Sequence, residues 1–319
     1  MLQPLHRVGL SVLLLLVVVA LPGATSAAFA PASPSIDALA RPFPAADGPS
    51  EWGAERVLAP RPPSVFASAQ VVAFYGHPGV PKMGALGVYT PERAADEVAL
   101  VAARYDELNG DRDVVPALHL ITAVAQPWPE ADGSYLERMP DEDLAYWVEL
   151  ARERGQLLII DIQIGWADPL AEVELLAGVL AEPFVHLALD PEWATRGSGL
   201  APGEVIGTLG AADVNAVQQY LAGIVRRNNL PPKALILHQF LGFMLTDTES
   251  YLDVPEVEVV IDMDGFGPPG AKLAGYDTFS LAPYAERPAI KLFYDWDEPI
   301  MEPDRIQGLD SRPDLVIYQ

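Results

Sequence analysis

A series of eight short apolar segments in the C-terminal part of this 319-residue chain constrains its fold more than any other feature. Each segment is rich in Leu or β-branched residues and is bounded by Pro, Gly, Asp or Asn, which is typical of short buried β-strands. The expected strands are Val71–Tyr75, Val114–Ile121, Gln156–Ile162, Phe184–Asp190, Lys233–Gln239, Val257–Asp262, Ala289–Tyr294 and Asp314–Tyr318.

Amphipathic stretches with helix start and stop signals lie between several of these segments. Asp168 and Asp213 are interpreted as caps of helix N-termini, because a short acidic side chain there accepts from free backbone N–H groups. The expected helices are Pro91–Leu108, Pro140–Arg154, one that opens at Asp168-Pro169, and Ala211–Arg227.

This alternation predicts a single-domain (β/α)₈ barrel, the TIM barrel, over residues 66–319. The competing fold is a doubly wound open sheet, which usually has a glycine-rich turn after its first strand. Here Tyr75-Gly76-His77-Pro78-Gly79 matches neither that turn nor a phosphate-binding loop. The last expected strand lies at the C-terminus, next to Gln319, and we expect the segment around Glu51–Val57 to cover the place of an eighth helix.

The N-terminus has the three parts of a secretory signal peptide. Arg7 precedes the apolar run Val8–Leu21, and small residues follow around Ala27. We therefore expect a signal peptide over residues 1–28, a Pro/Ala-rich spacer over 29–65, and a secreted protein. The apolar run is too short to span a bilayer, and a chain without cysteine has no lipid-modified cysteine, so no membrane anchor is expected after cleavage.

The chain is strongly acidic, with 44 Asp and Glu against 20 Lys and Arg and a formal net charge of −24. Such a surface repels phosphate backbones and anionic lipids, so nucleic acid and membrane surfaces are not expected partners. The expected partner is a carbohydrate or another small polar substrate. Oligomeric state leaves no signal in this sequence.

Carboxylates, imidazoles and amides gather at the C-terminal ends of the expected strands, where barrels of this kind hold their active sites. Side chains alternate along a strand, and on four strands the polar residues share the inward parity. The expected catalytic residues are Glu192, Asp190, Asp262, Asp264 and Asp295. The expected substrate-binding residues are Tyr75, His77, His119, Asp161, Gln163, Trp193, His238, Gln239, Tyr294 and Trp296.

Each of these positions also has a structural interpretation. An Asp after a strand often caps the next helix, and aromatic residues at the rim can form a hydrophobic collar. Deeper in the barrel, Glu258 and Lys291 have the same parity on neighbouring strands and are interpreted as a buried ion pair. His186 is expected to be hydrogen-bonded within the core.

Two carboxylates across a cleft are the minimal equipment of a glycosidase. Glu192 is the expected acid, because Asp190 and Trp193 should both raise its pKa, and the second carboxylate would be Asp262, Asp264 or Asp295. The stretch Asp190-Pro191-Glu192 resembles the D-x-E ending of the chitinase-like glycosidase barrels. The longer D-x-x-D-x-D-x-E signature of that family is incomplete here, with Val185 and Ala188 at its first two positions. The broader resemblance is to secreted glycosidase-type barrels.

Two alternatives to a glycosidase stay open. Asp161, Asp190, Glu192, His238, Asp262 and Asp295 could surround a divalent cation in a metal-dependent hydrolase or isomerase, with Mg²⁺, Mn²⁺ or Ca²⁺ favoured by oxygen ligands. No H-x-H or H-E-x-x-H spacing supports this, so neither a metal nor another cofactor is expected. The other alternative is a non-catalytic carbohydrate-binding or envelope protein.

Overall fold

A computed structural model of the protein describes residues 60–110 and 112–319. Within this part, eight parallel strands close into a barrel in the order β1-β2-β4-β5-β7-β9-β10-β11, and β11 pairs back with β1. The fold is therefore a TIM barrel, as predicted, and the open sheet is excluded. The strands are β1 (Ala69–Gly76), β2 (Asp113–Ala125), β4 (Leu157–Ile162), β5 (Val185–Leu189), β7 (Lys233–Gln239), β9 (Val257–Met263), β10 (Arg287–Leu292) and β11 (Leu315–Tyr318).

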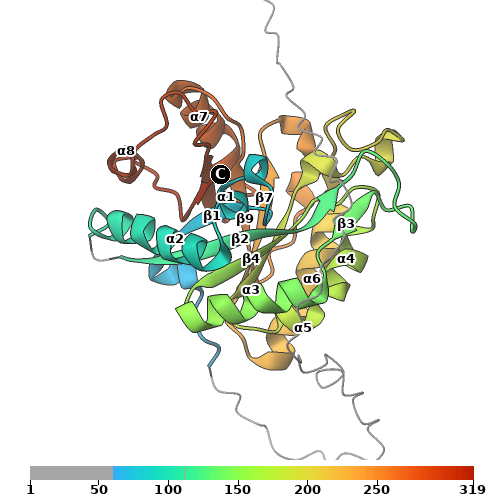
Figure 1. The fold of residues 1–319 in the computed structure, drawn as a ribbon, viewed down its shortest axis with the longest axis horizontal. Coiled ribbons are helices and arrows are strands. Elements are labelled where there is room, and N and C mark those ends of the chain that lie inside the picture. Colours follow the sequence, from blue (N-terminus) through green and yellow to red (C-terminus); the bar gives the residue numbers. More distant parts are fainter. Residues whose placement is uncertain (1–59, 111) are drawn as a thin grey trace, which may run out of the picture. The chain divides into compact units, whose positions relative to one another are not determined.

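Helices pack around this barrel between successive strands (Figure 1). The Asp168 side chain accepts from the Ala171 N–H and caps α4, as predicted. The cap predicted at Asp213 is wrong, because α6 begins after Gly210 and Asp213 lies inside its first turn. The helices are α1 (Ala85–Val88), α2 (Pro91–Asp106), α3 (Asp141–Arg154), α4 (Pro169–Leu175), α5 (Ala177–Leu180), α6 (Ala211–Asn228), α7 (Pro269–Gly275) and α8 (Pro303–Gln307).

Three short strands, β3 (Leu136–Arg138), β6 (Leu209–Gly210) and β8 (Leu245–Thr246), lie outside the barrel. β3 pairs antiparallel with the end of β2, and β6 pairs with β8. The connection from β7 to β9 holds only 3₁₀ turns and β8. None of the helices in the described ranges is long and apolar enough to cross a membrane.

The core has two apolar layers, one between the strands and the helices and one inside the barrel. Each buried Val, Leu or Ile side chain stabilises the fold by roughly 1.5–3 kcal/mol. The inner layer contains the five alanines Ala73, Ala117, Ala188, Ala234 and Ala289. Because these side chains are short, the inside of the barrel has room for the long polar side chains that lie above them.

At the lower rim, Arg61 pairs with Glu256 at 2.6 Å, and the Ser64 hydroxyl donates to Glu258. The last residues of the predicted spacer therefore contact the start of β9. The predicted signal peptide, the rest of the spacer and the segment Glu51–Val57 lie outside the described residues.

Candidate functional site

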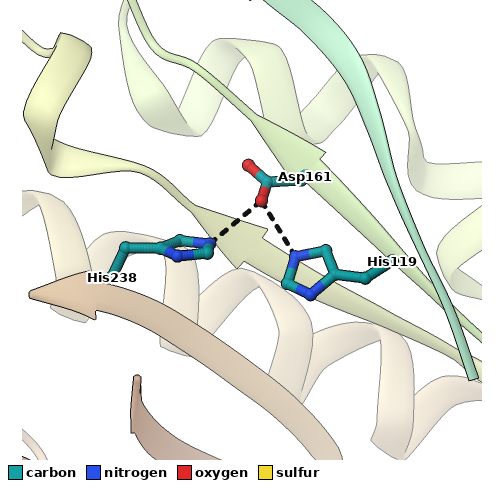
Figure 2. Close-up of side chains that lie close together, drawn as sticks. All are labelled: His119, Asp161 and His238. Carbon is teal, nitrogen blue, oxygen red and sulfur yellow. Dashed lines mark hydrogen bonds and ion pairs between the residues drawn. The ribbon is translucent and has the colours of Figure 1, made fainter. Parts of the chain in front are cut away.

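A buried carboxylate, Asp161, lies at the centre of the polar cluster inside the barrel. Its Oδ2 accepts from His119 Nε2 at 2.9 Å and from His238 Nε2 at 3.0 Å (Figure 2). The three residues come from β4, β2 and β7, and all three side chains are fully buried. Their strands are joined laterally, so the barrel closure brings together residues that are far apart in the chain.

The charges of this trio follow from its contacts. Burial alone would raise the pKa of Asp161, but His238 and the hydrogen bond from His119 lower it well below its usual range. Burial and the nearby Lys291 oppose protonation of His238, yet Asp161 raises the pKa of its imidazole well above the ordinary value. Burial lowers the pKa of His119. The trio therefore combines a carboxylate, an imidazolium and a neutral imidazole at neutral pH.

The other nitrogen of His238 faces the carboxylates of Asp262, in β9, and of Asp264, which follows the end of β9. Its Nδ1 lies 3.1 Å from Asp262 Oδ2 and 3.1 Å from Asp264 Oδ2. On the far side of Asp264, Lys291 Nζ lies 3.0 Å from Oδ1 and 3.5 Å from the centre of the Tyr75 ring. The ring of Tyr75 in turn packs edge-on against His119. A continuous set of charged and aromatic contacts therefore spans β7, β9, β10, β1 and β2.

The position of Lys291 corrects the predicted ion pair with Glu258. Glu258 is near the start of β9 and pairs with Arg287 at 2.6 Å, near the bottom of the barrel. Lys291 is two residues above Ala289, the register partner of Asp262, so its side chain reaches the upper cluster instead. His186 is buried, and its Nδ1 accepts from the Ala234 N–H at 3.0 Å, in the core position expected for it.

Asp190 and Glu192 follow β5 at the mouth of the barrel. The backbone N–H of Glu192 donates to Asp190 Oδ1 at 3.2 Å, so Asp190 caps the short turn Pro191–Trp193. Burial raises the pKa of Asp190, and the charge of Asp161 adds to this effect. Burial and the charges of Asp190 and Asp264 raise the pKa of the partly exposed Glu192 to about 8, although Lys291 and His238 oppose this.

Three other predicted binding residues form hydrogen bonds within the protein itself. Gln163 Oε1 accepts from the Ala125 N–H at 3.0 Å, and Gln239 Oε1 accepts from the Tyr284 hydroxyl at 2.8 Å. His77 Nδ1 lies 2.9 Å from the Ile121 carbonyl oxygen. These contacts give each side chain a structural role, whatever else it binds.

The structure places the remaining predicted residues on the rim. β10 ends at Leu292, two residues before its expected end, so Tyr294 and Asp295 lie in a turn and are exposed. Tyr294 stacks on Tyr318, with ring centres 5.4 Å apart. The rings of Trp296, Phe293 and Phe266 pack together, and Trp193 is half-buried beside Glu192.

Lys272 connects segments of this region, a role that was not predicted from the sequence. Lys272 is 1% exposed, donates to the Gly265 carbonyl at 2.7 Å and to the Lys291 carbonyl, and pairs with Asp297 at 3.2 Å. Asp297 accepts in turn from the Gly267 and Phe293 N–H groups. A lysine in a helix gives no sequence signal of such a role, because its partners lie in two separate loops.

Comparison of the chain with models of known protein families and with curated proteins finds no match.

Proposed function

We propose that the barrel mouth is the active site of a glycosidase-like hydrolase in which Glu192 is the general acid. The observation that carries this proposal is the position of Glu192, the partly exposed carboxyl on the open side of a buried cluster of acids. With its pKa raised to about 8, Glu192 keeps its proton at neutral pH, as an acid that protonates a leaving group must.

The same cluster contains an ionised carboxylate, the second group that a glycosidase needs beside its acid. Lys291, together with His238, lowers the pKa of Asp264 despite its burial, so this carboxylate stays ionised. Asp264 and its neighbour Asp262 can stabilise positive charge that develops on a sugar ring, or orient a water molecule. A protonated Glu192 and an ionised Asp264 are the two different carboxyl states that the mechanism requires.

A carbohydrate substrate is supported by the aromatic side chains at the rim. Phe266 is 55% exposed and packs against Trp296, with ring centres 5.7 Å apart. Flat exposed rings beside carboxylates suit the apolar faces of sugar rings. The D-x-E sequence of Asp190 and Glu192 is a further similarity to glycosidase barrels.

Export of the protein is part of the same proposal. It rests on the order of Arg7, the apolar run Val8–Leu21 and the small residues around Ala27. An exported enzyme meets envelope and environmental glycans, so the substrate class and the location agree.

The test is a polysaccharide-hydrolysis and glycan-binding screen of the mature protein, with Glu192→Gln and Glu174→Gln compared. Glu174 is an exposed carboxylate of α4 and is the matched control. We expect Glu192→Gln to lose activity by about 100-fold to 10,000-fold and Glu174→Gln to keep it. Glycan binding without turnover would favour the non-catalytic carbohydrate-binding protein, and no binding or cleavage of any glycan would refute the proposal.

A further inference from the structure

The carboxylate of Asp262 has no hydrogen-bond partner within the described part of the chain. It is 0% exposed, and neither Oδ1 nor Oδ2 accepts a hydrogen bond. A buried carboxylate oxygen without an aligned hydrogen-bond partner is costly, so it calls for a direct ligand. Asp262 Oδ2 lies 3.1 Å from His238 Nδ1.

His238 Nδ1 is itself close to two carboxylate oxygens without being hydrogen-bonded to either. It lies 3.1 Å from Asp262 Oδ2 and from Asp264 Oδ2, yet among the described residues it has no aligned acceptor. Two atoms that bind one metal ion at right angles, each about 2.1 Å from it, lie about 3.0 Å apart. The line between the two ligand atoms then makes an angle of about 45° with each metal–ligand bond. A proton on the nitrogen would point along that bond, too far from the oxygen for a hydrogen bond. The contacts of His238 Nδ1 therefore have the spacing and misalignment of metal ligands.

Contacts with neighbouring side chains hold His238 and Asp264 in the orientation that metal binding needs. The Nε2–H of His238 donates to Asp161 at 3.0 Å. This hydrogen bond orients the ring and directs Nδ1 toward the two carboxylates. Asp264 uses Oδ1 for Lys291 at 3.0 Å and leaves Oδ2 for the space near His238. The ligand atoms of His238, Asp262 and Asp264 all lie within 4.8 Å of one another.

We infer that His238 Nδ1, Asp262 Oδ2 and Asp264 Oδ2 bind one divalent transition-metal ion, Mn²⁺ or Zn²⁺. One imidazole nitrogen with two carboxylate oxygens suits these ions better than Mg²⁺ or Ca²⁺, which prefer oxygen ligands alone. The ion would replace the proton on His238 Nδ1 and give the Asp262 oxygens the direct partner that they lack. The inference goes beyond the proposed hydrolase, because it depends on these three ligands and not on Glu192 or on any substrate.

The test is metal binding to the full-length protein after treatment with EDTA, measured without substrate. We expect a Mn²⁺ titration followed by electron paramagnetic resonance to show one strong site per chain, and Zn²⁺ to compete for it. Pulsed measurements on bound Mn²⁺ should show coupling to one imidazole nitrogen, because His238 is the nitrogen ligand. This signal needs no variant, so it does not depend on whether a substituted protein folds.

Asp262→Asn should weaken Mn²⁺ binding at least about tenfold, whereas Asp253→Asn, at an exposed aspartate outside the site, should leave it unchanged. Circular dichroism of both variants checks that they are folded. Bound Mn²⁺ without nitrogen coupling, equal binding by Asp262→Asn and the wild type, or no binding of either ion at millimolar concentration would overturn the inference. Since no substrate is present, these results are independent of whether the protein hydrolyses a glycan.

Discussion

At the scale of single residues, the inside of this barrel holds more carboxylates than cations. Lys291 and the imidazolium of His238 face this cluster, and Lys272, which pairs with Asp297, lies near Asp262 and Asp264. A carboxyl that keeps its proton reduces this excess of negative charge. The pKa of both Asp190 and Glu192 is raised, which favours their protonated forms. The buried acids are Asp161, Asp190, Asp262 and Asp264, with Glu192 above them at the mouth.

The first prediction concerns the pH dependence of hydrolysis. Glu192 acts in its protonated form, so the rate should fall as the pH rises through about 8, where this carboxyl loses its proton. The measurement is the pH profile of kcat/KM on the substrate found in the screen. A rate that stays constant well above this pH would contradict the assignment of Glu192 as the acid.

The second prediction concerns stability at the same residue. Folding raises the pKa of Glu192 from about 4.5 to about 8, so the folded protein binds more protons than the unfolded chain in this window. The contribution of Glu192 to the free energy of unfolding therefore falls as pH rises between these values.

We expect Glu192→Gln to be more stable than the wild type by roughly 1–2 kcal/mol at about pH 9, with little difference at about pH 4.5. Urea denaturation at both pH values measures this, with Glu174→Gln as the control. A Glu192→Gln protein less stable at the higher pH would show that the carboxylate is stabilising there.

At the scale of elements, loops at the mouth are held against one another by backbone contacts. Gly165, in the loop after β4, has φ +59°, and a Cβ there would lie 2.6 Å from the Ser134 carbonyl oxygen. The next residue, Trp166, donates its N–H to that same oxygen at 2.7 Å. The loop after β4 and the hairpin formed by β2 and β3 therefore meet at a place with no room for a side chain.

The third prediction follows from this close approach. Gly165→Ala should destabilise the protein by roughly 1–3 kcal/mol, because it adds both a clash and backbone strain. Gly178→Ala in α5 is the control, since a Cβ there meets nothing within 4 Å and Ala favours the helix. Thermal unfolding of the two variants checks the difference, and equal melting temperatures would contradict it.

The fourth prediction concerns the connection between α7 and the turn after β10. Lys272→Met leaves Asp297 buried without its cation, which should cost about 3–5 kcal/mol. Lys82→Met, at an exposed lysine, is the control and should have almost no effect. Chemical denaturation measures both, and a small effect of Lys272→Met would mean that the surrounding backbone contacts hold Asp297 without it.

At the scale of the whole molecule, the formal charge of −24 makes the chain repel itself. The fifth prediction is that NaCl raises the melting temperature as it screens this repulsion. Mn²⁺ at matched ionic strength should raise it further in the wild type but not in Asp262→Asn, because only the wild type has a complete site. If NaCl has no effect or lowers the melting temperature, self-repulsion does not limit stability.

Local patterns in the sequence were enough to predict the fold, because each strand and helix is specified by residues near one another in the chain. All eight strands lie where their apolar runs predict, and Gln163, Asp190 and Asp262 lie at the strand ends predicted from where these runs stop. An error arose where a boundary depends on neighbouring elements, because β10 stops at Leu292 and not at Tyr294. The predicted start of α6 at Ala211 is confirmed, but Asp213 lies inside the first turn and does not cap the helix. The catalytic and binding roles given to these residues stay predictions.

The amino-acid sequence by itself therefore determined the barrel and the kinds of side chain at its mouth. Only the tertiary structure decided which of them meet: Asp161 with two histidines, and Lys291 with Asp264 instead of Glu258. The physical reason is that such contacts depend on strand register and on closure of the barrel. These properties join His238 to Asp161 across 77 residues, and no local pattern of the chain encodes them.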